Sequence, residues 1–258
     1  MIRIGVVSFT NAVPLSHDLE RFLPDAQIAH LTPSRIADAL AEGTLDVGLV
    51  PVAALASHPE WDVVPGLGIA SEGPVRSVLL ISKVPPEEIT RLVLDPASLT
   101  SNQLARLWLR HERGRTPQLL SGPPRLADRL ELGDATVAIG DEALHWAGTN
   151  ATSIDLGGAW TEWTGLPFVF AVWAGPKALP ELRPAFLGCY ESNAGRLDLL
   201  AKETDVPRAA LLESYWTQSI RYRLGDRENR GLMRYLSLGA EAGYFRPVEK
   251  GRPYVQSA

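Results

Sequence analysis

The stretch that decides the fold lies at the start of the chain and reads Arg3-Ile4-Gly5-Val6-Val7-Ser8-Phe9-Thr10-Asn11-Ala12-Val13-Pro14-Leu15. Its apolar, β-branched run predicts a strand that ends at Ser8, and Pro14 predicts the first turn of a helix. In open α/β sheets ligands bind beyond the carboxyl ends of the strands, so the polar loop between them is the first candidate site. The alternative is that Ser8, Thr10 and Asn11 only cap the helix and its turn.

The order of strand, loop and helix recurs along the first two thirds of the chain. The spacing of apolar residues predicts strands over 45–50, 76–82, 92–95, 135–139 and 168–174, with helices that begin near residues 33, 52, 98 and 141. From Pro180 onward the apolar spacing is helical nearly to the end. Alternating strands and helices are typical of the α/β class, here with mixed, mostly parallel sheets flanked by helices.

Two strongly apolar strands, 76–82 and 168–174, bracket the middle of the chain. We expect them to be the two crossings between a first lobe and an inserted second lobe. The first lobe would combine both chain ends, residues 1–82 and 172–258, and the second would span residues 83–171. Two hinged lobes of this kind hold a ligand in the cleft between them. The alternative is a single doubly wound domain.

Composition limits the classes of partner. The 258 residues are 45% hydrophobic and 21% charged, which is enough apolar material for a proper core. A net charge of −5 argues against nucleic acid or an anionic membrane surface as a partner. No segment resembles a membrane span or a secretory leader, so we expect a cytoplasmic protein.

The chain lacks the familiar motifs for metals, nucleotides and nucleophilic serines. Its single cysteine, Cys189, excludes an intrachain disulfide and a thiolate metal cluster. The histidines and acidic residues show no metal-binding spacing, and there is no glycine-rich phosphate loop or serine elbow. We therefore predict no metal. The arginines at 221, 223, 227 and 230 are interpreted as a solvent-exposed helical face.

A set of segments carries a family resemblance through its order along the chain. The set comprises the opening stretch, Thr32–Ala37, Gly43–Val52, Thr100-Ser101, Ile139–Leu144, Asp155–Gly157 and Thr164–Ala171. Together these segments resemble the chorismate dehydratases of the futalosine-dependent menaquinone pathway. The resemblance covers the first two thirds of the chain, and the helical last third carries no motif of this kind.

The resemblance implies a two-lobed fold like that of periplasmic binding proteins of the second type, used as an enzyme. The implied reaction is that of a hydro-lyase: it removes water from chorismate to give 3-[(1-carboxyvinyl)oxy]benzoate, without a metal or an organic cofactor. Because the product ring is aromatic, the protein has mainly to position the substrate and assist proton transfer. The two carboxylates of chorismate need two anion holders, and helix N-termini with Ser or Thr hydroxyls are suitable.

The resemblance also assigns roles to residues around the expected cleft. Asn11 would contact the leaving hydroxyl, and Ser77 would lie at the cleft floor; these two are the candidate catalytic residues. The candidate substrate-binding residues are Ser8, Thr100, Ser101, Gly140 and Asp141. Asp141 is interpreted as a binding residue or a helix cap rather than a base, because a carboxylate facing a dianionic substrate is costly.

The cleft motifs contain no histidine, and His145 is the one nearest to them in sequence. If no protein base is present, the enolpyruvyl carboxylate of the substrate itself could take the ring proton. Two other functions stay open: an enzyme like the dihydroxynaphthoate synthase of the same pathway, and a non-enzymatic solute-binding protein for a small anion. We expect a small-molecule partner, chorismate, and a monomer or homodimer.

Overall fold

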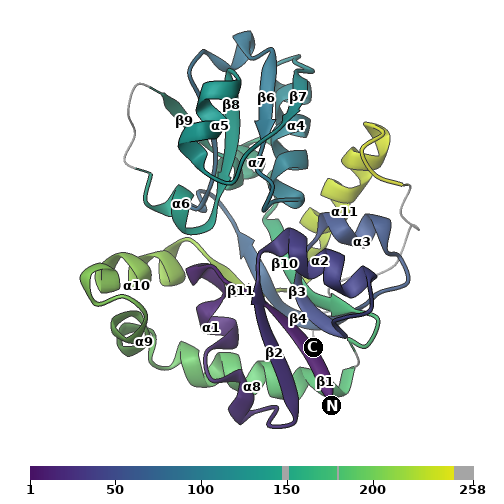
Figure 1. Ribbon diagram of the computed structural model, residues 1–258, viewed down its shortest axis with the longest axis vertical. Helices are drawn as coiled ribbons and strands as arrows, with labels where there is room; N and C mark the ends of the chain where they lie inside the picture. Colours follow the sequence, from purple (N-terminus) through teal and green to yellow (C-terminus); the bar gives the residue numbers. More distant parts are fainter. Residues whose placement is uncertain (147–150, 179, 247–258) are drawn as a thin grey trace.

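The computed structural model describes residues 1–146, 151–178 and 180–246, and it has two lobes, each built on its own sheet (Figure 1). The first lobe contains a six-stranded sheet in the order β11-β4-β10-β3-β1-β2. Its strands are β1 (Ile2–Val7), β2 (Ala26–Leu31), β3 (Val47–Pro51), β4 (Asp62–Ser71), β10 (Phe168–Gly175) and β11 (Arg221–Arg223). Both chain ends therefore contribute to this lobe.

The second lobe contains a five-stranded sheet in the order β7-β6-β8-β5-β9. Its strands are β5 (Val78–Ser82), β6 (Arg91–Leu94), β7 (Gln118–Ser121), β8 (Ala135–Ile139) and β9 (Thr152–Asp155). Strands β3, β5, β8 and β10 are buried along their whole length, so the core of each lobe is built on central strands.

Helices cover the sheets. They are α1 (Val13–Ser16), α2 (Pro33–Ala41), α3 (Ala53–Ser57), α4 (Thr100–Glu112), α5 (Leu126–Leu132), α6 (Gly140–Leu144), α7 (Leu156–Thr164), α8 (Arg183–Ala194), α9 (Leu197–Thr204), α10 (Ala209–Gln218) and α11 (Asp226–Glu241). Short 3-10 turns include η1 (Thr10–Ala12), η2 (Leu19–Arg21), η3 (Pro86–Glu88), η4 (Pro180–Leu182) and η5 (Val206–Arg208). Helix α2 follows the predicted pattern, with Pro33 at its first position and Gly43 at φ +71° after its end.

The predicted α/β fold with two lobes and mixed sheets is confirmed, but the strand directions differ in detail from a mostly parallel arrangement. Among the described residues, four strand pairs are parallel and five are antiparallel. Strands such as β1, β3 and β8 end at the cleft. Strands β5 and β10 are the first strands after each crossing, so they start at the cleft. They are therefore antiparallel to their neighbours β8 and β3.

The crossings are loops rather than strands. Strand β5 pairs only within the second sheet and β10 only within the first. The chain therefore leaves the first sheet after Ser71 and returns to it at Phe168. The expected boundary at residue 82 placed strand β5 in the first lobe, whereas β5 belongs to the sheet of the second lobe. The sequence could not show this, because a long apolar strand is equally compatible with a crossing and with the centre of a sheet. Residues 247–258 of the expected first lobe lie outside the described residues.

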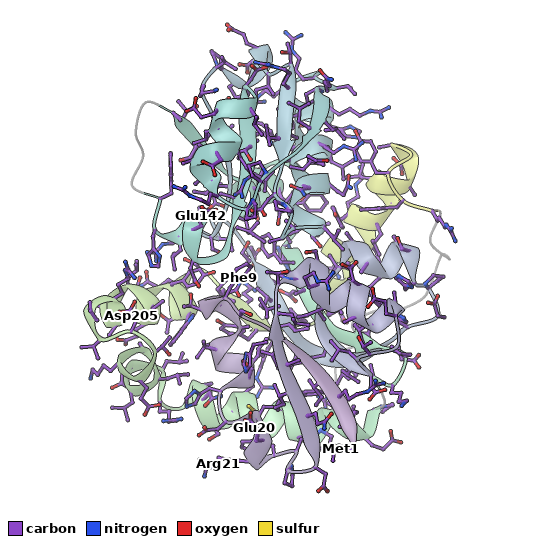
Figure 2. The ribbon with its side chains drawn as sticks, in the orientation of Figure 1. Met1, Phe9, Glu20, Arg21, Glu142 and Asp205 are labelled. Carbon is purple, nitrogen blue, oxygen red and sulfur yellow. The ribbon has the colours of Figure 1, made fainter. Side chains whose placement is uncertain are left out.

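A buried carboxylate fixes the start of the opening strand. Asp46 is 2% exposed and accepts hydrogen bonds from Arg3, while its Oδ1 lies 2.8 Å from Lys177 Nζ. The hydrogen bond with the Arg3 guanidinium is the main cause that holds the pKa of Asp46 well below its usual range. Strand β1 is thereby anchored at one end, and its other end leads to Phe9, which Figure 2 shows between the two lobes.

Candidate active site

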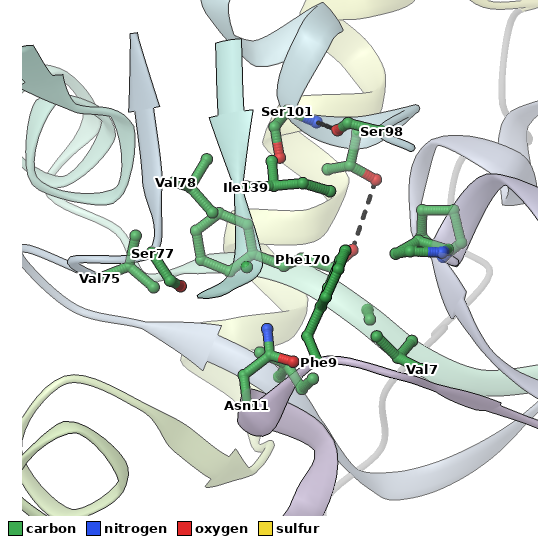
Figure 3. A pocket seen from close by; sticks show the side chains of 16 residues that line it. Val7, Phe9, Asn11, Val75, Ser77, Val78, Ser98, Ser101, Ile139 and Phe170 are labelled. Atoms are coloured by element: carbon green, nitrogen blue, oxygen red, sulfur yellow. Dashed lines mark hydrogen bonds between the residues drawn. The ribbon is translucent and has the colours of Figure 1, made fainter. Parts of the chain in front are cut away.

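A cavity lies between the lobes, at the strand ends of both sheets (Figure 3). The first lobe contributes Val7, Phe9, Asn11, Pro33, Pro51, Ile69, Phe170 and Ala171. The second lobe and the crossing before it contribute Val75, Ser77, Val78, Ser98, Thr100, Ser101, Ile139 and Gly140. Its lining is mostly apolar with a few convergent polar groups, which is the usual character of small-ligand sites.

Among the described residues, the cavity lining carries no ionisable side chain. Its polar side chains are the amide of Asn11 and the hydroxyls of Ser77, Ser98, Thr100 and Ser101. An anionic ligand would therefore meet N–H and hydroxyl donors rather than a cation. A reaction in this space has no strong protein base among the sixteen lining residues.

The loop that carries Asn11 is held from three sides. Trp216 donates from its indole Nε1 to the carbonyl of Thr10 at 2.9 Å, and Tyr222 donates from its hydroxyl to the carbonyl of Asn11 at 2.9 Å. The backbone N–H and the hydroxyl of Thr10 both donate to the carboxylate of Asp141. Two of these supports come from the last third of the chain, where the sequence offered no motif.

Asn11 and Ser77 are brought together at a third residue, Tyr215. Ser77 and Tyr215 are each 1% exposed, and the Tyr215 hydroxyl donates to Ser77 Oγ at 2.5 Å. The Asn11 side chain also interacts with the Tyr215 hydroxyl. The other end of that amide, Oδ1, is buried without a hydrogen-bond partner. Burial raises the pKa of Tyr215 well above its ordinary value, so its hydroxyl stays protonated.

Thr100 and Ser101 begin helix α4 and both line the cavity, but the Thr100 hydroxyl is already engaged. It accepts from the N–H of Ala53 at 3.1 Å and lies 3.4 Å from the carbonyl of Phe170, to which it donates. Thr100 thereby ties the second lobe to the first. The N–H of Ser101 donates to Ser98 Oγ at 3.1 Å, so Ser98 satisfies a backbone N–H of the first helical turn, although the N-cap residue is Leu99. Ser98 is a cavity residue that the sequence analysis did not single out.

The remaining predicted residues are divided between the cavity and its surroundings. Gly140 lines the cavity at φ +64°, and a Cβ there would lie 2.6 Å from the Phe9 ring. Asp141 does not line the cavity; it lines an outer hollow that shares Phe9 and Ile139 with it. Ser8 is exposed and lies outside the cavity lining, with its N–H bonded to the carbonyl of Leu31 at 3.0 Å. His145 lines a separate hollow.

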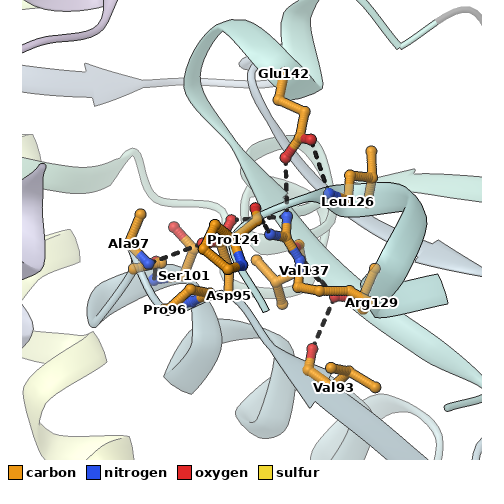
Figure 4. A network of polar contacts seen from close by, with 12 residues as sticks. Val93, Asp95, Pro96, Ala97, Ser101, Pro124, Leu126, Arg129, Val137 and Glu142 are labelled. Carbon is orange, nitrogen blue, oxygen red and sulfur yellow. Dashed lines mark hydrogen bonds and ion pairs between the residues drawn. The ribbon is translucent and has the colours of Figure 1, made fainter. Parts of the chain in front are cut away.

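Beneath the second-lobe side of the cavity lies a buried arginine that the sequence analysis missed (Figure 4). Arg129 is 0% exposed, and its Nη2 lies 3.2 Å from Asp95 Oδ2 and 3.0 Å from Glu142 Oε2. Its Nη1 also donates to the carbonyls of Pro123 and Pro124. Asp95 precedes the loop to α4 and Glu142 lies on α6, so Arg129 connects the two segments that supply Ser101 and Gly140.

Direct hydrogen bonds join the lobes across the cleft. Besides the contacts of Asp141 with Thr10 and of Tyr215 with Ser77, the hydroxyl of Ser34 donates to the carbonyl of Pro96 at 2.9 Å. The cavity is therefore enclosed by two lobes in contact.

Two features are absent from the described residues. Within residues 1–146, 151–178 and 180–246, no group of three or more His, Cys, Asp and Glu side chains could hold a metal ion. In the same residues no helix is both long and apolar enough to cross a membrane.

Comparison with known proteins gives both a family and a fold. A family model described as menaquinone biosynthesis matches residues 2–241. The chorismate dehydratase of Thermus thermophilus is 28% identical over 256 residues, covering 89% of this chain and 92% of that protein.

Solved structures with low sequence identity establish the fold alone. A protein from Archaeoglobus fulgidus aligns with a TM-score of 0.72 at 14% identity, covering 94% of this chain and 97% of its own. The alkanesulfonate-binding protein of Xanthomonas axonopodis pv. citri aligns with a TM-score of 0.67 at 17% identity, covering 99% and 98%. The predicted periplasmic-binding-protein-like fold is thus confirmed.

Proposed function

The chain belongs to the menaquinone biosynthesis family, and we propose that it is a chorismate dehydratase, a hydro-lyase that converts chorismate to 3-[(1-carboxyvinyl)oxy]benzoate and water. The observation that carries the proposal is the cavity between the lobes, to which both Asn11 and Ser77 contribute and in which none of the described lining side chains is ionisable. This arrangement suits an elimination driven by aromatisation, in which positioning and help to the leaving group matter more than a strong base. The similarity to the Thermus thermophilus enzyme supports the same substrate.

In the proposed complex, the ring hydroxyl of chorismate lies between Asn11 and Ser77. The start of helix α4, with Ser98 and Ser101, faces one substrate carboxylate, because hydroxyls and a helix N-terminus are suitable donors to an anion. The substrate's enolpyruvyl carboxylate removes the proton from the neighbouring ring carbon. The electrons of that C–H bond form the new ring double bond, the C–O bond breaks, and the proton that the carboxylate removed passes to the departing hydroxide, which leaves as water.

Asp141 and His145 are not bases in this proposal. The Asp141 carboxylate is engaged by Thr10 outside the cavity lining, and His145 lines another hollow. Reaction without a cofactor, a cytoplasmic location and a monomeric or homodimeric state belong to the proposal as well.

The test is to mix the purified protein with chorismate and to follow loss of the diene absorbance, with the product identified by mass spectrometry. We expect loss of one water per chorismate in the wild type. In Asn11→Ala and Ser77→Ala we expect turnover to fall about 100-fold or more, because each removes a group that contacts the leaving hydroxyl. Ser237→Ala is the matched control, since Ser237 is an exposed serine on α11 and should keep wild-type turnover.

Two results would refute the proposal in different ways. Chorismate that binds but is recovered unchanged would indicate a solute-binding protein. Chorismate that does not bind at all would direct the search to the larger substrate of the naphthoate-synthase type.

A further inference from the structure

We propose that Tyr215, on helix α10, is a positioning residue that fixes Ser77 as a hydrogen-bond donor toward the substrate's leaving hydroxyl, which Asn11 faces with an unpartnered amide oxygen. The inference rests on the proposed function, because it concerns the same cavity. It assigns a role to the last third of the chain, which supplies none of the candidate catalytic residues.

The direction of the hydrogen bond between Tyr215 and Ser77 determines which hydroxyl proton remains for the cavity. The Tyr215 hydroxyl has one proton and donates it to Ser77 Oγ at 2.5 Å. Ser77 also has one hydroxyl proton, and because its oxygen accepts from Tyr215, that proton is left to point elsewhere. Ser77 lines the cavity, and Figure 3 shows its side chain there beside that of Asn11. Ser77 is thereby prepared to donate to a group bound in the cavity.

The amide of Asn11 supplies the matching acceptor. Its carbonyl oxygen, Oδ1, is buried, and among the described residues it has no hydrogen-bond partner. A buried polar atom without a partner is costly, so a ligand group that donates to it is favoured. A hydroxyl that donates to Asn11 and accepts from Ser77 satisfies both residues.

The position of Tyr215 links this arrangement to the contact between the lobes. Tyr215 lies on α10, and the next residue of that helix, Trp216, donates a hydrogen bond to the first-lobe loop at Thr10. Ser77, in contrast, directly precedes strand β5 of the second lobe. Their hydrogen bond therefore crosses the cleft. The donor and acceptor pair is complete only when the lobes are in contact, which also excludes water from the leaving group.

The experiment compares steady-state dehydration of chorismate by the wild type, Tyr215→Phe, Ser77→Ala and the double variant. Tyr215→Phe keeps the ring and removes only the hydroxyl. We expect kcat to fall about 10- to 100-fold with KM within about threefold, because the reacting groups lose their orientation while the cavity keeps its shape. Ser77→Ala should be at least as impaired. The double variant should be no more than about threefold slower than Ser77→Ala, because Tyr215 acts largely through Ser77.

Tyr222→Phe is the matched control. Its hydroxyl is also buried and also supports the loop, but it donates to the backbone carbonyl of Asn11 rather than to a reacting side chain. Thermal unfolding of each variant is measured alongside. A smaller loss of kcat in Tyr222→Phe than in Tyr215→Phe, at similar stability, supports positioning.

Three outcomes overturn the inference. They are wild-type kcat in Tyr215→Phe, multiplicative losses in the double variant, and equal losses of kcat in the two tyrosine variants that follow their losses of stability. An inactive wild type is a different failure: it removes the proposed function, and the inference falls with it.

Discussion

Arg129 is the buried residue whose removal has the most predictable cost. The change is Arg129→Met, which keeps an unbranched chain of similar length and removes the charge. In the native protein Arg129 is fully buried, and the side chain of its partner Asp95 is 6% exposed. Breaking such a pair leaves an uncompensated buried carboxylate, which costs about 3–5 kcal/mol of the free energy of unfolding. The second partner, Glu142, is 43% exposed on its side chain, so water replaces Arg129 there at little cost.

The pH dependence of this cost has a definite sign. Burial raises the pKa of Asp95 above its ordinary value even with Arg129 present, which opposes the shift. Without Arg129 that pKa rises further, so the folded variant takes up a proton at a higher pH than the unfolded chain does. The neutral acid no longer needs a cation. The difference in stability between wild type and variant should therefore shrink as the pH falls through the raised pKa of Asp95.

The assay is equilibrium urea unfolding of both proteins at several pH values. Arg125→Met is the control, because the Arg125 side chain is 79% exposed and its contact with Asp128 is 4.0 Å long; we expect a change within about 0.5 kcal/mol. A loss below about 1 kcal/mol in Arg129→Met, or a loss that does not change with pH, would refute the reasoning. Either result would mean that Asp95 is not the group left without its charge partner.

Two further predictions concern a glycine of the cavity and an exposed end of the second sheet. Gly140→Ala should raise KM for chorismate by about 10-fold or more and lower the thermal midpoint, because φ is +64° and the new Cβ would lie 2.6 Å from the Phe9 ring. The control is Gly43→Ala, at φ +71° in open space, which should lower stability alone. Equal KM values in the two variants would contradict the proposed contact with Phe9. The pKa of Asp134 is lowered to about 2, chiefly by the hydrogen bond from the Thr90 hydroxyl. The stability that Asp134→Asn loses should therefore be constant above about pH 4 and should vanish as the pH falls through about 2. Thermal unfolding against pH checks this, and a loss that persists undiminished at pH 2 would be inconsistent with it.

The sequence was most informative where local pattern and tertiary position coincide. The opening strand, the loop with Asn11 and the start of α4 all follow from short segments, and strand ends in this class of fold point to the cleft. The sequence could not distinguish a residue that lines the cavity from one that only holds it. Thr100 and Asp141 were both expected to bind the ligand, yet their side chains bond to protein groups across the cleft, and of the two only Thr100 lines the cavity. That distinction depends on how the lobes meet, which no local pattern encodes.

Two strands lay beyond sequence prediction for a simpler reason. Strand β2 contains no fully buried residue, and β11 has only three residues, of which one is buried. Neither has an apolar run long enough to be recognised. The arginines interpreted as one helical face are therefore divided between β11 and α11. Arg221 and Arg227 both pair with Glu72, so they connect elements rather than only facing solvent.

The last third of the chain shows why a stripe of apolar residues can hide function. Tyr215 and Trp216 fit a helical core pattern, and both are indeed buried. Each also carries one polar atom at the end of a large apolar ring, and both polar atoms reach the cavity side of the first lobe. The rings stabilise the lobe while the polar atoms hold the loop and orient Ser77. Since Ser77 belongs to the other lobe, the Tyr215–Ser77 hydrogen bond both joins the lobes and orients the residue that the proposed function places beside the leaving hydroxyl.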